Sequence, residues 1–262
     1  MYKALITDLD GTAVPLTSDG REITNSTRTA VHDATERGFL LACATGRHWE
    51  YAEPVIKRLG FTAPSIIEGG TRIVDASGRT LWEKALSAGV STDILAIFKD
   101  AAPQAIFMSS IDSGRYDLAK IHTLPDHMRF MYAIGVPAEA GAAIIRQING
   151  KMPAVGHVTP SWDGGELLDV HVTHTDGTKE HAVKVWQDLQ KVTIAETVGM
   201  GDAGNDLPIF AASGLKIAVE NASPELKSQA DYIAPPVTDQ ALEHVIRKFF
   251  LAPTAPTKPS PK

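Results

Sequence analysis

The segment Tyr2–Thr12, YKALITDLDGT, decides the fold because a short apolar run ends there in a polar turn. The apolar part predicts a buried β-strand, and the Asp-x-Asp-Gly that follows predicts a turn at its carboxyl end. The next segment, 24–38 (TNSTRTAVHDATERG), predicts a helix that Thr24 or Asn25 caps, and 39–46 (FLLACATG) predicts a second strand. A strand, a helix and a strand at this spacing form a βαβ unit, which requires a parallel sheet with a right-handed crossover.

The rest of the chain continues this pattern and interrupts it once. Further elements of the same kind are predicted at 50–59 (helix), 64–70 (strand), 71–86 (hairpin), 176–190 (helix), 194–202, 215–221 and 231–236 (strands). The interruption mixes antiparallel-looking strands with helices, namely helices at 92–101 and 138–149 and strands at 104–110, 154–162 and 166–172. We therefore expect an α/β fold with a doubly wound, Rossmann-like parallel sheet as its core and an inserted α+β cap domain. The expected limits are 1–83 and 172–251 for the core domain, 84–171 for the cap domain and 252–262 for a disordered, Pro-rich tail.

The composition narrows the class of protein. Of the 262 residues, 44% are hydrophobic and 21% are charged, which is ordinary for a globular protein with a full core. The net charge of −6 argues against nucleic acid or an anionic membrane as a partner. A single cysteine, Cys43, excludes an internal disulfide framework, and no run has the length of a membrane span or a signal peptide. We expect a cytoplasmic protein, either a monomer or a small homo-oligomer.

Four short segments carry polar groups that a structural core does not need. They are 8–12 (DLDGT), 44–47 (ATGR), Lys179 and 201–206 (GDAGND). Three of them follow predicted strands directly, and Lys179 begins a predicted helix. Because the carboxyl ends of neighbouring strands in a doubly wound sheet share one crevice, segments distant in the sequence can meet there.

The acidic residues of these segments indicate a metal ion. Asp8 and Asp10 flank Leu9, so their side chains project to the same side of an extended chain. Asp202 and Asp206 add negative charge from another strand end. Carboxylates that converge repel one another unless protons or a cation intervene, and a partial set of oxygen ligands favours Mg²⁺.

The remaining polar residues form a cradle for an anion. Thr45 offers a hydroxyl group, Gly46 a backbone N–H and Arg47 a forked cation, all of which suit phosphate oxygens. Lys179 adds a point charge. A cationic phosphate cradle beside an anionic metal cradle is typical of phosphoryl transfer.

In order and spacing, the four segments resemble the four motifs of the haloacid dehalogenase superfamily. The stretch 201–233 (GDAGNDLPIFAASGLKIAVENASPELKSQADYI) is similar to the Cof-type branch, the sugar-phosphate phosphatases, whose cap lies between the second and third motifs. The resemblance covers about 1–83 and 172–250. It implies a Mg²⁺-dependent phosphomonoesterase that acts on a small soluble phosphate, such as a sugar phosphate or a phosphoglycolate-like acid.

The resemblance also implies a role for each matching residue. Asp8 would be the nucleophile that forms an aspartyl-phosphate, and Asp10 would act as general acid and then as base. The residues that would hold the substrate's phosphate are Leu9, Thr45, Gly46, Arg47, Lys179 and Asn205. The Mg²⁺ ion would be held by Asp8, the Asp10 carbonyl and Asp202, with Asp206 as a direct or indirect contact.

Two positions depart from the branch, and the cap offers no motif. Glu180 follows Lys179 where the branch usually has glycine, and Gly69 stands where many relatives carry asparagine, which implies a different substrate mouth. His171 and His174 lie three apart in a predicted strand and should point to opposite faces, so they do not support a zinc site. We expect both to have packing or surface roles.

Other functions share parts of this pattern. Gly199, Gly201 and Gly204 spell the G-x-G-x-x-G of a dinucleotide-binding turn. The carboxylates of Asp202 and Asp206 in that turn would repel a pyrophosphate, so we reject this interpretation. A phosphomutase of phosphomannomutase type shares the core and remains the alternative; a bisphosphate requirement would distinguish it.

Overall fold

The computed structural model describes residues 1–110, 114–161 and 165–252. The chain divides into two compact units. The first contains 1–43, 54–63 and 190–262, and the second contains 44–53 and 64–189. The second unit therefore includes the whole predicted cap, and the domain limits expected from the sequence remain a prediction. Most of the predicted tail, 253–262, lies outside the described residues.

A five-stranded parallel sheet forms the centre of the first unit. Its order is β13-β12-β11-β1-β2, and every adjacent pair is parallel. The strands are β1 (Ala4–Thr7), β2 (Leu40–Cys43), β11 (Thr197–Gly201), β12 (Leu215–Val219) and β13 (Tyr232–Ala234). All residues of β1 and β11 are buried, as expected for strands covered on both faces. The predicted α/β fold with a parallel central sheet is confirmed.

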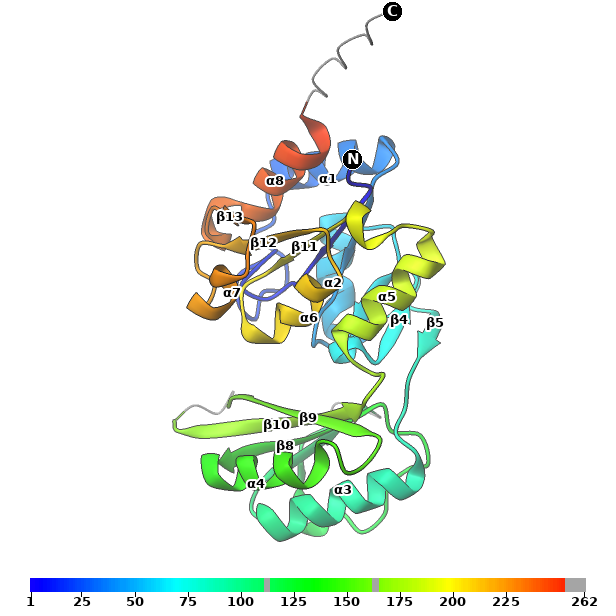
Figure 1. Cartoon of the computed structure of the whole chain (residues 1–262), viewed down its shortest axis with the longest axis vertical. Helices are drawn as coiled ribbons and strands as arrows, with labels where there is room; N and C mark the ends of the chain where they lie inside the picture. The colour runs from blue at the N-terminus through cyan, green and yellow to red at the C-terminus, as the bar shows by residue number, and fades with distance from the viewer. Residues whose placement is uncertain (111–113, 162–164, 253–262) are drawn as a thin grey trace, which may run out of the picture. The chain divides into compact units, whose positions relative to one another are not determined.

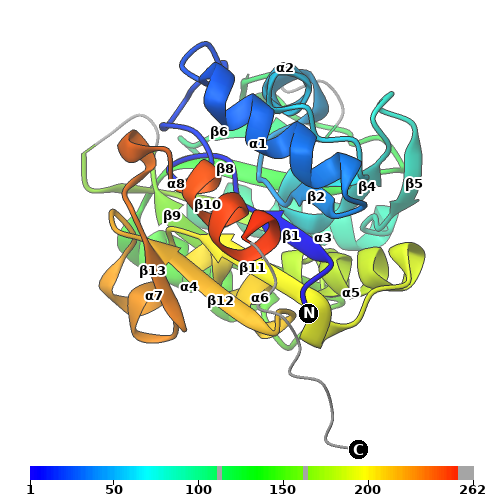
Figure 2. The ribbon, with the colours of Figure 1, turned by 90° about the horizontal axis from the view of Figure 1, so that it is seen from above.

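Helices cover both faces of this sheet. They are α1 (Asn25–Glu36), α6 (Leu207–Ala211), α7 (Pro224–Ser228) and α8 (Ala241–Ile246). The chain moves from β1 to β2 in one direction along the sheet and from β11 to β12 in the other, so right-handed crossovers place α1 and α6 on opposite faces. Helix α8 packs beside α1 (Figure 2). Thr24 caps α1 as predicted, and its hydroxyl group accepts the Thr27 N–H.

Two sheets belong to the second unit. The smaller one is the predicted hairpin with one more strand: β3 (Ser65–Ile67), β4 (Arg72–Val74) and β5 (Thr80–Glu83), all antiparallel. Helix α2 (Trp49–Leu59) precedes it in the chain, and helix α5 (Lys179–Gln190) ends the unit. The Trp186 indole N–H donates to the Pro64 carbonyl at 2.6 Å, which fixes α5 beside the start of β3.

The larger sheet of the second unit is antiparallel and has the order β7-β6-β8-β10-β9. Its strands are β6 (Ile106–Ser109), β7 (Tyr116–Asp117), β8 (Phe130–Pro137), β9 (Ala154–Pro160) and β10 (Leu167–His174). Helices α3 (Ala88–Ala101) and α4 (Ala138–Ile148) lie against one face of it (Figure 1). The residues that fill this interface are apolar, among them Phe98, Phe107, Met131, Ile144, Val170 and Val172.

Two elements of this sheet region differ from the sequence prediction. Strand β8 was not predicted, although it lies at the centre of the sheet, because Gly135 and Pro137 divide its apolar run before α4. Helix α3 begins at Ala88, earlier than the predicted 92, because the Ser87 hydroxyl group caps it by accepting the Val90 N–H. Within the described part of the chain, no helix has the length and apolar character needed to cross a membrane.

Candidate active site

The ends of β1 and β11 bring two of the predicted acidic residues together. The two strands are parallel neighbours in which Thr7 is paired with Met200. The Asp8 N–H donates to the Met200 carbonyl at 2.9 Å, so Asp8 continues the ladder by one residue. Asp202 follows the last residue of β11. Both carboxylates therefore stand at the same edge of the sheet, as the strand order requires.

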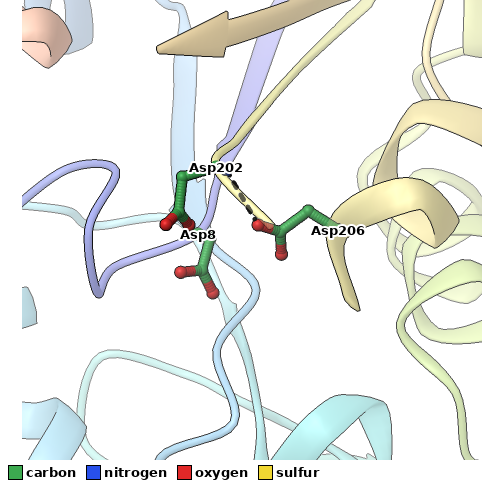
Figure 3. Close-up of side chains that lie close together, drawn as sticks. All are labelled: Asp8, Asp202 and Asp206. Carbon is green, nitrogen blue, oxygen red and sulfur yellow. Dashed lines mark hydrogen bonds between the residues drawn. The ribbon is translucent and has the colours of Figure 1, made fainter. Parts of the chain in front are cut away.

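Asp8, Asp202 and Asp206 form one acidic cluster. Each offers an oxygen atom, and these three atoms lie within 4.8 Å of one another. Figure 3 shows the Asp8 and Asp202 side chains side by side, with the Asp206 carboxylate on the far side of the turn. Asp8 is 6% exposed and Asp206 is completely buried. Asp202 is half-buried. Three carboxylates this close repel one another, two of them in buried positions, so the cluster is suited to a cation.

The turn after β1 is shaped to receive the Asp202 carboxylate. Gly11 has φ +76°, and a Cβ atom there would lie 2.5 Å from Asp202 Oδ2. The Thr12 hydroxyl group donates to Asp202 Oδ1 at 2.9 Å, and the Asn221 amide donates to the Gly11 carbonyl at 2.8 Å. Glycine is therefore required at position 11 both for its backbone conformation and for the space that the carboxylate occupies.

Asp206 supports the cluster through the backbone. Its Oδ2 atom accepts the N–H groups of Asp202 at 3.0 Å and Ala203 at 3.3 Å, the first of which is dashed in Figure 3. These bonds fix the turn that carries Asp202. The donor set is made only of carboxylate oxygens, which is the set that Mg²⁺ prefers. The three acidic residues could therefore hold a Mg²⁺ ion.

The other predicted residues of the first unit lie in the same two turns. The Asp10 side chain is outside the acidic cluster, and its Oδ1 atom accepts the Thr17 N–H at 3.0 Å. Leu9 is completely buried. Asn205 is exposed in a single helical turn, Gly204–Asp206. Their predicted roles in proton transfer and phosphate binding remain predictions.

The residues predicted to bind phosphate from the second motif begin the second unit. Thr45 is 1% exposed, and its hydroxyl group accepts the Arg47 N–H at 3.2 Å, which closes a tight turn. A Cβ atom at Gly46 would meet nothing within 4 Å, so this backbone stands open. One guanidinium N–H of Arg47 donates to the Tyr51 carbonyl at 3.1 Å.

The loop after β3 joins this turn to Lys179. The Thr45 carbonyl accepts the Gly69 N–H at 3.0 Å, and the next residue, Gly70, packs against the backbone of Thr178 and Lys179 so closely that no Cβ atom would fit. Lys179 is the first residue of α5 and is 4% exposed. The second unit thus gathers Thr45 and Lys179 around the loop 68–70.

Sequence reasoning missed several residues around that loop. Glu68 is 2% exposed with φ +55°, and the Arg129 Nε–H donates to its Oε2 atom at 2.6 Å. His48 and His171 also lie beside the loop. Only His48, next to Arg47, had a signal in its position. Glu68 follows β3 without a motif. Arg129 and His171 come from the predicted cap, which offers no motif and where pairing across the sheet decides which side chains meet.

Known proteins with similar sequences or structures agree with this fold. A relative from Serratia proteamaculans (strain 568), named HMP-PP phosphatase, is 27% identical over 97% of this chain and 97% of its own length. The solved structure of BT1666 from Bacteroides thetaiotaomicron, described among phosphatases of the haloalkanoate enzyme superfamily, has a TM-score of 0.78 at 18% identity and covers 96% of both chains. A haloacid dehalogenase-like hydrolase from B. subtilis has a TM-score of 0.78 at 17% identity, covering 94% of this chain and 99% of its own.

The parallel sheet and the acidic turns after β1 and β11 define a hydrolase of the haloacid dehalogenase type. The chain belongs to the haloacid dehalogenase-like hydrolase family, whose sequence model matches residues 5–133 and 126–246. The predicted membership of the Cof-type branch is confirmed, and with it the prediction that the chain is an enzyme of this superfamily.

Proposed function

We propose that the chain is a Mg²⁺-dependent phosphomonoesterase that acts on a small phosphorylated metabolite through an aspartyl-phosphate on Asp8. The observation that carries the proposal is the acidic cluster, in which oxygens of Asp8, Asp202 and Asp206 lie within 4.8 Å of one another at the ends of two parallel strands. The family and the relatives named as phosphatases support the same reaction class.

Asp8, the Asp10 carbonyl and Asp202 would hold the Mg²⁺ ion, with Asp206 fixing the turn that carries Asp202. When bound, the ion supplies positive charge that reduces repulsion between the attacking carboxylate and the anionic phosphate. The Thr12 hydroxyl group and the missing side chain at Gly11 keep the Asp202 carboxylate in place.

The proposed reaction has two steps at phosphorus. An Asp8 carboxylate oxygen attacks the phosphorus atom, the bond from phosphorus to the ester oxygen breaks, and the leaving alkoxide takes a proton from the Asp10 carboxyl group. The Asp10 carboxylate then removes a proton from water, whose oxygen attacks the aspartyl-phosphate and releases inorganic phosphate and free Asp8. Asp10 suits this role because its side chain stands outside the acidic cluster.

The remaining motif residues would bind the phosphate. We assign the backbone N–H groups of Leu9 and Gly46, the Thr45 hydroxyl group and the Arg47, Lys179 and Asn205 side chains to this task. Support comes from the motif resemblance and from the loop 68–70, which holds Thr45 and Lys179 in one unit. We further propose that 84–171 is the cap domain that selects the substrate and that the enzyme works in the cytoplasm.

The test is hydrolysis of p-nitrophenyl phosphate by the full chain with and without Mg²⁺. We expect phosphate release that EDTA abolishes and excess Mg²⁺ restores. Asp8→Asn removes the nucleophile and should lower turnover by roughly 10⁴-fold or more. Exposed His32→Ala serves as the control and should retain wild-type turnover. Full activity of Asp8→Asn, or isomerisation of a hexose phosphate without phosphate release, would contradict the proposal.

A further inference from the structure

One face of the antiparallel sheet carries a row of aromatic and imidazole side chains. Strand register pairs Tyr132 on β8 with His171 on β10, and His171 with His157 on β9. Because alternate residues of a strand point to opposite faces, this row stands on the face opposite to Val170 and Val172, which pack under α3 and α4. Figure 1 shows both helices on that other face. The row Tyr132–His171–His157 is called the imidazole row below.

His171 at its centre is buried and has an unsatisfied nitrogen. Its ring stacks on Tyr132 with centroids 4.2 Å apart and an angle of 8° between the planes, and Phe130 and His157 contact it edge-on. The side chain is 8% exposed, and its Nε2 atom has no hydrogen-bond partner among the described residues. Buried polar atoms are nearly always paired, so an unpaired imidazole nitrogen points to a ligand group.

The row is uncharged near neutral pH. Burial holds the pKa of His171 well below its usual value, and the neighbouring His157 and His48 lower it further. Burial and the nearby Asp169 carboxylate raise the pKa of Tyr132, so its phenol stays protonated. The row therefore presents flat, neutral rings with hydrogen-bonding atoms.

The nearby cation of Arg129 is already engaged. Its guanidinium donates to both carboxylate oxygens of Glu68, at 2.6 and 3.3 Å, and to the Ser110 carbonyl at 3.0 Å. A second carboxylate, that of Glu83, lies 3.7 Å from its Nη1 atom. The charge of Arg129 is thus balanced by the carboxylates of Glu68 and Glu83. A carboxylate of a substrate would have to compete with them for the guanidinium.

The row lies beside the segments to which we assign phosphate binding. The His48 ring, one residue after Arg47, lies 4.8 Å from the Phe130 ring. The positive charge of Lys179 is close enough to Tyr132 to lower the pKa of its hydroxyl group. Gly69, in the loop that contacts Thr45, faces His171, and a Cβ atom there would lie 2.7 Å from His171 Cε1.

We propose that the imidazole row binds the leaving group of the substrate, and that this group is a planar, uncharged, hydrogen-bonding ring rather than a carboxylate. The inference rests on the proposed phosphatase activity and chooses between the kinds of substrate compatible with it. A ring can stack on the row and reach Nε2 of His171 with a donor or acceptor. A carboxylate would lose its hydration against the uncharged rings of the row.

The test compares 4-carbamoylbenzyl phosphate with 4-carboxybenzyl phosphate, which have the same shape and differ in one charge. We expect kcat/KM of the full-length enzyme with Mg²⁺ to be at least about tenfold higher for the amide, mainly through KM. Cyclohexylmethyl phosphate, which cannot stack, should fall below benzyl phosphate. Equal values for the amide and the acid, or preference for the acid, would overturn the inference while leaving the phosphatase intact; hydrolysis of none of these esters or of p-nitrophenyl phosphate would overturn both.

Variants separate binding by the row from a structural role. His171→Ala should raise KM for the amide more than it lowers kcat and should reduce the preference over the acid toward unity. His171→Gln, which restores a hydrogen-bonding group, should recover part of that preference, and exposed His122→Ala should keep all of it. Gly69→Ala provides a second route, because it leaves His171 in the sequence but presses a methyl group against its ring. Retention of the full preference in well-folded His171→Ala and Gly69→Ala enzymes would refute the role of the row.

Discussion

In the parallel sheet the chemical groups follow the ends of strands, whereas in the antiparallel sheet they stand on one face of the strands. Asp8 and Asp202 come directly after β1 and β11, and Gly11 and Thr12 complete their turn. The imidazole row instead consists of cross-strand neighbours that no turn or motif joins, such as Tyr132 and His171. The local backbone conformation of a turn fixes the side chains that follow a strand end. The side chains that meet on the face of a sheet depend instead on the register of the strands. This difference agrees with the two proposals, which assign the catalytic step to the first region and the selection of substrate to the second.

The largest expected effect is a loss of stability when the ion pair between Glu68, in the loop 68–70, and Arg129 is broken. Arg129→Met leaves the Glu68 carboxylate, 2% exposed, without its closest cation. Breaking a buried pair from one side costs about 3–5 kcal/mol, so the free energy of unfolding in urea should fall by that amount. Lys184→Met breaks an exposed pair with Glu180 and should cost less than about 0.5 kcal/mol.

The double variant Glu68→Gln/Arg129→Met sharpens the interpretation. It removes both charges together and should be more stable than Arg129→Met alone. If Arg129→Met lowers the free energy of unfolding no more than Lys184→Met does, the pair between Glu68 and Arg129 does not stabilise the fold beside the imidazole row.

The next effect concerns the strand-end region. Gly11→Ala should lower phosphatase turnover by about 10²-fold, because a methyl group 2.5 Å from Asp202 Oδ2 must displace that carboxylate by a large fraction of an ångström. Gly150→Ala is the control, since Gly150 also has a positive φ, +75°, but open space around it. Both should lose a similar increment of stability from the backbone, roughly 1 kcal/mol, and only Gly11→Ala should lose activity. Equal activity of the two variants would show that the Asp202 position is not critical.

The sequence predicted one of these regions far better than the other, and the residues show why. The carboxylates of Asp8, Asp10, Asp202 and Asp206 were expected to converge. Those of Asp8, Asp202 and Asp206 do, because they follow the ends of neighbouring parallel strands, whereas the Asp10 side chain lies outside the cluster and accepts the Thr17 N–H. Strand β8 was missed. His171 was expected to have a packing or surface role, and the sequence carries no local signal for its contacts across the sheet. Its stacking on Tyr132 depends on which residues pair across β8 and β10, and a shift of one residue would turn His171 to the other face. Glu68 was likewise unpredictable, since its partner Arg129 is 61 residues away.

A smaller loss of activity is expected when Asp206 is replaced, because its side chain supports the acidic cluster through hydrogen bonds from the backbone. Asp206→Ala removes the acceptor of the Asp202 and Ala203 N–H groups and should lower activity or apparent Mg²⁺ affinity by about 10–100-fold. Asp206→Asn keeps one oxygen acceptor and should lose less. Measuring turnover across a Mg²⁺ titration distinguishes the two, and an alanine variant as active as the asparagine variant at all Mg²⁺ concentrations would exclude the orienting role.

The smallest expected effect is the contribution of His171, on the face of the antiparallel sheet, to the pH dependence of the free energy of unfolding. His171 has a folded-state pKa well below its usual 6.5, chiefly because it is buried. Above that usual value both states are neutral at this site; below it the unfolded chain binds a proton that the folded protein does not, so stability falls as the pH falls. His171→Asn removes this term, and the stability advantage of wild type over the variant should be about 1.4 kcal/mol smaller at pH 5.5 than at pH 7.5. Urea unfolding of both proteins at these pH values measures it. The carboxylate cluster is the same in both proteins, so its titration cancels in the difference, and a difference that stays constant with pH would mean that His171 is not held neutral in the row.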